Sequence, residues 1–432
     1  SGPAGGAILA TRIANQCGFD NIVSFDMGGT TAKICLIDQG KPQYSRSFEV
    51  ARQYRFMKGS GIPIRIPVIE MVEIGAGGGS IAHLDELQRI QVGPESAGSE
   101  PGPACYGRGG TKATVTDADV ELGRIRPDRF AGGSIQLHAD SSKAAIVAAI
   151  GKPLGLTDTS AALAISEVVE ENMANAARVH AVERGKELVG RAMVAFGGAA
   201  PLHAARLAQK LDVNTVVVPT GAGVGSAVGF LMAPVSFEVV RSRYVQLNDS
   251  FDPAMINKFR GEMRAEAAAV IRRGAPDAPL VETWTADMRY RGQGHDVTVT
   301  IPAKPLAAAD RADLAVMFEA QYVVQFGRKI PGLEVEVLSW ALRLATVDPP
   351  VPPCPPSPPD RAADAVGRAQ VADQATGHYQ VVPIYTRASL SPGHMLMGPA
   401  LIVEDAPPTM EIDGFQASIN GLGYIVMTRG EQ

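Results

Sequence analysis

The segment at residues 26–33, Asp-Met-Gly-Gly-Thr-Thr-Ala-Lys, combines residue types that can bind phosphate. Gly28 and Gly29 let main-chain N–H groups approach phosphate oxygens, because no Cβ stands in the way. Thr30 and Thr31 add hydroxyl donors beside those amides. We therefore expect the two glycines to bind a phosphorylated ligand and the two threonines to lie near the reacting atoms.

Two charged residues flank this turn. Asp26 ends a predicted strand, where a carboxylate can hold Mg²⁺ through water or orient an attacking group. Lys33 lies beyond the turn, where side chains alternate between the two faces, so it can also point away from a ligand. An ordinary tight hairpin, with Asp26 stabilising the turn, is the alternative that these residues leave open.

A second glycine pair lies in the segment 195–201, Ala-Phe-Gly-Gly-Ala-Ala-Pro, between a predicted strand and a predicted helix. Gly197, Gly198 and Ala199 would let the flat face of a base or a ribose pack on the backbone. The helix that follows favours negative charge at its N-terminus. A tight turn between strand and helix is the simpler alternative for this segment taken alone.

A glycine-rich loop at 75–80 offers a further candidate site. Gly77, Gly78 and Gly79 can form an anion-binding nest of backbone amides, and a purely structural turn is the alternative. Glu70 and Glu73 precede this loop and could act as a base or as metal ligands. We favour a solvated or salt-bridged pair for these two carboxylates.

The remaining candidates have a structural explanation that competes with a functional one. Asp117 and Asp119 could bind Mg²⁺, but helix N-capping is simpler. Cys105 lacks a nearby histidine in sequence, which favours a buried core thiol over a nucleophile. His203 can contact a ligand or pack as a neutral side chain, and His295, which follows two glycines, is a candidate functional residue of the C-terminal region. The histidines show no metal-binding spacing, so we expect no protein-ligated metal.

The order of predicted elements indicates an α/β fold. Apolar runs around Gly28 and Gly29 predict a strand, a turn and a strand over residues 21–38. The strand at 192–196, the helix at 201–211 and the strand at 214–219 have the spacing of a βαβ unit, which indicates an α/β sheet. The later elements are a helix at 158–184, a strand at 192–196, a helix at 201–211, a strand at 214–219 and a helix at 224–232.

Beyond residue 242 the pattern changes. Residues 243–348 alternate amphipathic helices with strands and predict an α+β domain. Residues 349–360 form a stiff proline-rich linker, with eight prolines between 349 and 359. Residues 361–432 hold short apolar strands and predict a small β-rich C-terminal domain.

Composition excludes several classes of partner. The chain has 432 residues, a net charge of −5 and no run of Lys or Arg, so we expect neither nucleic acid nor a membrane surface as partner. No segment has the ~18 unbroken apolar residues of a membrane span. Four widely spaced cysteines fit a reducing cytoplasm.

The two glycine motifs together resemble the phosphate and adenosine signatures of actin-like ATPases, whose core is ribonuclease H-like. In that superfamily a nucleotide lies between two lobes. The resemblance implies that the turns at 28–29 and 197–198 lie side by side and bind ATP with Mg²⁺, the latter through Asp26. In this assignment Asp26, Thr30 and Thr31 are catalytic, and the cofactor-binding residues are Gly28, Gly29, Gly77, Gly78, Gly79, Gly197, Gly198 and Ala199.

A closer resemblance covers residues 1–242. SGPAGGA at 1–7, PVIEMVEIGAGGGSIA at 67–82, VGPESAGSEPGPACYGRGG at 92–110 and AFGGAAPLHAARLA at 195–208 resemble consecutive blocks of the hydantoinase A/oxoprolinase family. Residues 1–242 are thereby interpreted as an actin-like ATPase lobe with a glycine-rich insert at 60–126. The version at 67–82 is similar to the branch that includes acetophenone carboxylase-type subunits.

The resemblance implies an ATP-dependent enzyme. ATP would phosphorylate a carbonyl oxygen of a cyclic amide before hydrolysis, or serve the carboxylation of a ketone, within an oligomeric complex containing a hydantoinase B-type subunit. Family members also carry a front lobe with its own Asp-x-Gly-Gly-Thr motif. This sequence has that motif only at Asp26. We therefore expect this chain to lack the family's N-terminal lobe, so that the separate lobe or another subunit supplies the other wall of the nucleotide site. A non-catalytic ATP-binding scaffold lobe is a further alternative.

Overall fold

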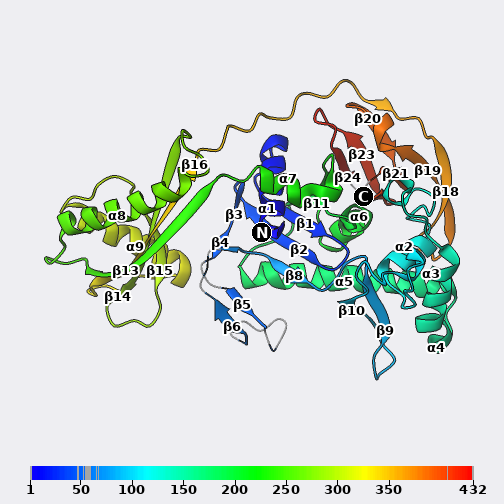
Figure 1. The fold of residues 1–432 in the computed structure, drawn as a ribbon, viewed down its shortest axis with the longest axis horizontal. Coiled ribbons are helices and arrows are strands. Elements are labelled where there is room, and N and C mark those ends of the chain that lie inside the picture. Colours follow the sequence, from blue (N-terminus) through cyan, green and yellow to red (C-terminus); the bar gives the residue numbers. More distant parts are fainter. Residues whose placement is uncertain are drawn as a thin grey trace. The chain divides into compact units, whose positions relative to one another are not determined.

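The computed structural model describes residues 2–45, 48–51, 53, 60–64, 66, 68–405 and 407–430. The chain forms two compact units (Figure 1). The larger unit contains residues 1–233 and 351–432, and the smaller unit contains residues 234–350. Among the helices of the described residues, none has the length and apolar character needed to cross a bilayer.

The larger unit is built on a mixed ten-stranded sheet. At its centre β1 (Ile22–Met27) pairs in parallel with β11 (Ala192–Phe196), which pairs in parallel with β12 (Thr215–Val218). β2 (Ala32–Asp38) pairs antiparallel with β1 and completes the predicted hairpin. β1 and β11 are almost entirely buried, as expected for central strands covered on both faces.

The sheet continues beyond these strands on both sides. In order along the sheet, the strands are β17, β20, β23, β24, β12, β11, β1, β2 and β3, and β8 also pairs with β2. The bounds of the outer strands are β3 Lys41–Pro42, β8 Val72–Ile74, β17 Arg361–Ala362, β20 His394–Met397, β23 Phe415–Ile419 and β24 Ile425–Arg429.

Helices cover both faces of this sheet. Figure 1 shows α1 (Gly2–Cys17) and α7 (Gly225–Leu231) on one side of β1 and β2, and α5 (Asp158–Glu183) on the other. α6 (Ala200–Lys210) packs against α5 and against β11 and β12. α1 and α7 pack closely along each other, because glycines at their crossing let the backbones approach. The arrangement is an α/β fold, as the sequence predicts.

The glycine-rich insert and the segments on either side of it form small elements beside the sheet. β9 (Ser80–Leu84) and β10 (Ile90–Ser96) make a hairpin, and α2 (Val115–Glu121) and α3 (Ala139–Ile146) follow it. Two further antiparallel pairs are β4–β7 and β5–β6. Their bounds, with that of one short helix, are β4 Tyr44–Ser45, β5 Phe48–Val50, β6 Ile62–Ile64, β7 Val68–Ile69 and α4 Lys152–Leu154.

The smaller unit is an antiparallel four-stranded sheet with two helices. The strand order is β13, β16, β14 and β15, and α8 and α9 pack with this sheet around Trp284, Trp340 and Phe318. The unit begins earlier than the sequence predicts, because β13 is a full partner of β16. The bounds are β13 Ser236–Gln246, α8 Pro253–Ile271, β14 Leu280–Tyr290, β15 Val297–Ile301, α9 Asp310–Phe326 and β16 Val335–Thr346.

Residues 361–432 do not form the separate domain that the sequence suggests. β24 pairs with β12, so the C-terminal strands extend the central sheet of the larger unit. This pairing covers a strand edge that would otherwise expose its amides and carbonyls. A second sheet, with the order β18, β19, β21 and β22, packs against α6 through β22. Its strands are β18 Gly367–Ala372, β19 Tyr379–Thr386, β21 Ala400–Val403 and β22 Thr409–Glu411.

Candidate active site

The turn between β1 and β2 presents backbone to open space. The N–H of Gly28 donates to the carbonyl oxygen of Thr31 at 3.1 Å and closes the turn. A Cβ placed on Gly28 or Gly29 would meet no atom of the described residues within 4 Å. Within the described part of the chain, no hydrogen bond occupies the amides of Gly29 and Thr30, and both residues are exposed. These two amides are therefore available to an anion.

The second glycine turn lies directly beside the first. β1 and β11 are parallel neighbours with Asp26 opposite Phe196, so both turns leave the same edge of the sheet. A Cβ on Gly197 would lie 2.5 Å from Asp26 Oδ1 and 2.5 Å from the Met27 carbonyl oxygen, and its φ is +102°. The N–H of Ala199 donates to the same Met27 oxygen at 2.8 Å. Glycine at 197 is therefore required for the two turns to touch, which is the placement that the sequence predicts.

Asp26 lies half-buried between these turns. The Ser226 hydroxyl donates to Asp26 Oδ2 at 2.6 Å. Burial raises the pKa of Asp26 above its usual value, and the hydrogen bond from Ser226 and the charge of Lys33 act in the opposite direction. Lys33 is the residue directly opposite Asp26 in the antiparallel register, so the two side chains share a face of the sheet. The sequence carries no signal that places Ser226 here, and it leaves the direction of the Lys33 side chain open.

The glycine-rich loop at 75–80 supports the first turn from behind. The N–H groups of Gly78 and Gly79 donate to the carbonyl oxygens of Gly28 at 3.0 Å and Gly29 at 2.7 Å. The N–H of Gly77 donates to Ser80 Oγ at 2.8 Å. All three amides are used within the chain, so the prediction that Gly77, Gly78 and Gly79 bind an anion through them is corrected. Their lack of side chains instead lets this loop lie against the turn.

α2 is held by hydrogen bonds to that loop and to the segment that carries Cys105. The backbone N–H and the hydroxyl of Thr116 both donate to the carbonyl oxygen of Gly78, at 2.7 and 2.8 Å. The N-cap residue is Thr114, and Asp117 completes a reciprocal capping box from the third helical position, so the N-capping interpretation is confirmed for Asp117 and is wrong for Asp119, which pairs with Arg124 and His203. Asp117 also accepts from the amide of Cys105 at 2.8 Å. Cys105 is fully buried and burial raises the pKa of its thiol, which fits a core residue rather than a nucleophile.

A buried charge cluster links α2, α5 and α6. His203 is fully buried, with Nδ1 3.1 Å from Glu170 Oε1 and Nε2 3.2 Å from Asp119 Oδ2. Arg124 lies 3.4 Å from Asp119. Burial by itself would lower the pKa of His203, but the two carboxylates raise it to about 9. His203 is therefore buried between two carboxylates that favour its charged form, and it has no exposed surface with which to contact a ligand.

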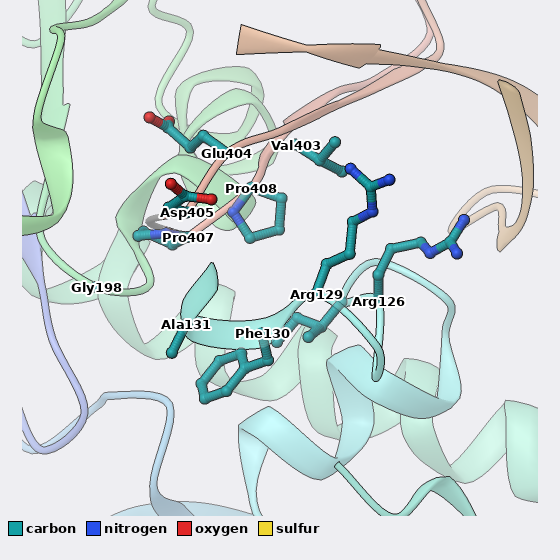
Figure 2. Close-up of a pocket in the computed structure, with 11 residues that line it drawn as sticks. Arg126, Arg129, Phe130, Ala131, Gly198, Val403, Glu404, Asp405, Pro407 and Pro408 are labelled. Carbon is teal, nitrogen blue, oxygen red and sulfur yellow. The ribbon is translucent and has the colours of Figure 1, made fainter. Parts of the chain in front are cut away.

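A pocket of about 220 Å³ lies next to Gly198. Figure 2 shows the segment with Glu404 and Asp405 across from the turn that carries Phe130. The walls are mostly apolar, and burial raises the pKa of Glu404 at the rim. The volume suits one ring system rather than a drug-sized ligand of ~300–1,000 Å³. The lining residues are Ile125, Arg126, Arg129, Phe130, Ala131, Gly198, Val403, Glu404, Asp405, Pro407 and Pro408.

Other predicted candidates lie elsewhere or have structural partners. Glu70 forms an ion pair with Arg184 at 2.7 Å, as the salt-bridge interpretation expects. Glu73 pairs across strands with Lys33 and is exposed. His295 is exposed and belongs to the smaller unit. A functional role for it stays a prediction. The residues that converge are thus Asp26, the turn at 28–31, Lys33, Gly197–Ala199 and Ser226.

Residues 1–239 match the family model described as hydantoinase/oxoprolinase, and residues 261–422 match the hydantoinase/oxoprolinase C-terminal domain. The chain belongs to the hydantoinase/oxoprolinase family. The glycine turns, the loop behind them, the buried cluster and Ser226 all lie within the first of these two matches, so they are parts of the region that defines the family.

Members with described activities are similar along the whole chain. The caprolactamase alpha subunit of Pseudomonas jessenii is 30% identical over 435 residues, covering 100% of this chain and 61% of the relative. The acetophenone carboxylase gamma subunit of Aromatoleum aromaticum is 31% identical, covering 93% and 55%. A nucleotide-free structure of acetone carboxylase matches with a TM-score of 0.83 and 26% identity, covering 100% and 61%. The chain therefore spans about three-fifths of the length of these relatives.

Proposed function

We propose that this chain is part of an ATP-dependent hydrolase that acts on cyclic amides, with an ATP-dependent ketone carboxylase as the alternative. The observation that carries the proposal is the contact of the two glycine turns at Asp26, Met27 and Gly197. An antiparallel hairpin beside two parallel strands, with a glycine turn after β1 and another after β11, also supports an actin-like, ribonuclease H-like assignment for this sheet.

The residues present fit ATP with Mg²⁺. Gly28, Gly29 and Gly198 face space that none of the side chains in the described ranges fills, which is what a closely bound phosphate or sugar needs. A carboxylate with one oxygen held by Ser226 suits a Mg²⁺ ion bound through water. Bound with Mg²⁺, ATP would supply the phosphoryl group that activates the carbonyl oxygen of the substrate.

The chain's own groups would act mainly by position and charge. The amides of Gly29 and Thr30, with the Thr30 and Thr31 hydroxyls, would donate to phosphate oxygens. Lys33 would offset negative charge from the same face as Asp26. The backbone at Gly198 and Ala199, with the pocket beside it, would hold the nucleoside. Such an arrangement suits phosphoryl transfer, which depends on positioning and charge neutralisation.

The carboxylase alternative is favoured by a separate observation. The acetone carboxylase structure superposes over 100% of this chain, so the same fold serves that chemistry in a relative. For either reaction we propose further subunits, including a hydantoinase B-type subunit. A front lobe, or a subunit in its place, would supply the second wall of the nucleotide site.

The test is substrate-stimulated release of ADP by the assembled complex with ATP and Mg²⁺. We expect stimulation by lactams, hydantoins or 5-oxoproline that does not depend on bicarbonate. Stimulation only by ketones, and only with bicarbonate, would establish the carboxylase instead. Failure of every substrate would contradict both proposals.

A variant separates catalysis from a scaffold role. Asp26→Ala should abolish the stimulated ADP release while the complex still assembles. Intact activity in that variant would show that this chain is a non-catalytic scaffold lobe.

A further inference from the structure

Two of the four cysteines lie near each other where the proline-rich segment passes the end of α1. Cys17 is the last residue of α1, and Cys354 lies within the proline-rich segment. The N–H of Cys354 donates to the carbonyl oxygen of Gln16 at 2.7 Å. The residue directly before Cys17 therefore fixes the backbone of Cys354, although the two cysteines are far apart in sequence.

Both side chains line one cavity of about 270 Å³ in the larger unit. Each is partly exposed, whereas Cys35 and Cys105 are buried. Asn420 also lines this cavity and lies 3.7 Å from Cys17 Sγ through its Nδ2. A small oxidant such as a peroxide can therefore reach the thiols of Cys17 and Cys354 more readily than those of Cys35 and Cys105.

The proline-rich segment is held rigidly at this point. Gly421 packs so closely on the carbonyl oxygen of Pro355 that a Cβ there would overlap it. Proline rings fix φ in this stretch and reduce the ways in which the segment can move. A disulfide needs Cα atoms ~4.4–6.8 Å apart. The hydrogen bond from Cys354 to Gln16 places the backbones of the two cysteines side by side, and we expect the thiols to reach that separation without refolding.

We propose that Cys17 and Cys354 are a modification site, a thiol pair that peroxides oxidise to a disulfide linking the proline-rich segment to α1. The proposal does not depend on the function proposed above. It assigns a role to two residues that the candidate active site does not use.

The chemistry balances with a peroxide as oxidant. The Cys354 thiolate attacks one oxygen of hydrogen peroxide, the O–O bond breaks, and a sulfenic acid and hydroxide form. The sulfur of Cys17 then attacks the sulfenic sulfur, an S–S bond forms, and the second oxygen leaves as hydroxide. The two thiol protons convert both hydroxides to water, so two thiols and one peroxide give a disulfide and two waters.

The surroundings of Cys17 suggest this order of attack. Burial, together with the nearby Cys354 thiol, raises the pKa of Cys17 to about 11. Because the thiolate is the nucleophile, Cys17 reacts slowly with a diffusing peroxide. It still reacts once a sulfenic acid is held beside it.

The experiment treats the full chain with hydrogen peroxide and maps peptides without reduction. We expect free thiols to fall from four to two and a Cys17–Cys354 linked peptide to appear, reversed by a phosphine reductant. The unfolding temperature of the larger unit should rise by on the order of 5–10 °C. Four unreacted thiols, links between different molecules, or over-oxidation of Cys354 without a link would each overturn the proposal.

Matched variants and a second reagent keep the test independent of folding defects. Cys354→Ser should give no link, Cys17→Ser should accumulate a trappable sulfenic acid at Cys354, and Cys35→Ser should link as the parent does. In the unmodified protein, a bifunctional reagent such as dibromobimane should join Cys17 and Cys354. Failure to join them would show that the thiols are too far apart and would also overturn the proposal.

Discussion

Asp26 and Gly197 touch so closely that any side chain at 197 would displace the carboxylate. The position of a Cβ on Gly197 lies 2.5 Å from Asp26 Oδ1. Two segments about 170 residues apart in sequence are thus joined at one point. This contact holds the acidic residue of the first turn against the backbone of the second, which is the arrangement on which the proposed nucleotide site depends.

Gly197→Ala should disrupt this contact and the fold around it. Overlap with the Met27 carbonyl oxygen and a φ of +102° both penalise a side chain. We expect the free energy of unfolding to fall by ~2–4 kcal/mol. Both tryptophans lie in the smaller unit, so unfolding of the larger unit should be followed by far-ultraviolet circular dichroism.

Gly198→Ala is the matched control, because in the part of the chain that the structure describes a Cβ there meets no atom within 4 Å. It should unfold like the parent protein yet bind nucleotide more weakly in the complex. If Gly198→Ala bound nucleotide normally and Gly197→Ala were fully stable, the packing argument would be wrong.

Ser226→Ala should shift the pH dependence of turnover. The Ser226 hydroxyl lowers the pKa of Asp26, so its removal raises that pKa further. Turnover that needs the carboxylate is lost as the pH falls through its pKa, so the acid limb of the pH–rate profile should move to higher pH. Asp26→Asn should remove activity at every pH. An acid limb that Ser226→Ala leaves in place would mean that Asp26 does not set it.

The buried His203 predicts a loss of stability at alkaline pH. Its pKa is about 9 in the folded chain against 6.5 when exposed, so its contribution is complete below pH 6.5 and is lost as pH rises to about 9. The loss should be about 3 kcal/mol by urea unfolding. His203→Gln should be less stable at pH 6.5 and show a flatter dependence. An unchanged slope in that variant would assign the effect to other groups.

The buried carboxyl of Glu411 should make the folded chain less stable as the pH rises, over a lower pH range than His203 does. Burial raises the pKa of its carboxyl from 4.5 to about 8, although the amides of Ala417 and Gly398 oppose this shift. A raised carboxyl pKa favours the folded state only when protonated, so stability should decline between pH 4.5 and 8. Glu411→Gln should match the parent near pH 4.5 and exceed it at pH 8 by on the order of 3–5 kcal/mol. A Glu411→Gln variant that is less stable at pH 8 would contradict this explanation.

Much of the central sheet can be predicted from the sequence, because local patterns specify it. The hairpin at 22–38 and the strand–helix–strand unit at 192–218 follow from apolar runs and glycine turns. The pairing of β24 with β12 could not be predicted, since nothing local in the strand at 425–429 selects a partner about 210 residues earlier. Long-range strand pairing depends on the whole fold, so the local sequence pattern alone favours a separate domain for the C-terminal strands.

The candidate active site also has parts that the local sequence predicts and parts that it does not. The glycine pairs have a local signature, and the structure places them together. Ser226 carries no signal beyond an ordinary serine in a glycine-rich helix, so its contact with Asp26 needs three-dimensional packing. For the glycines at 77–79 the sequence predicts an anion-binding nest, whereas the amides of Gly78 and Gly79 donate to the backbone of the first turn. The same glycine pattern suits both an anion-binding nest and a loop that must lie against another backbone.

The central claim is that one nucleotide lies against both glycine turns. A structure of the assembled complex with a non-hydrolysable ATP analogue and Mg²⁺ tests it most directly. We predict phosphates beside the amides of Gly29 and Thr30 and the nucleoside beside Gly198. A nucleotide bound elsewhere in the complex, with both turns free of it, would contradict the account.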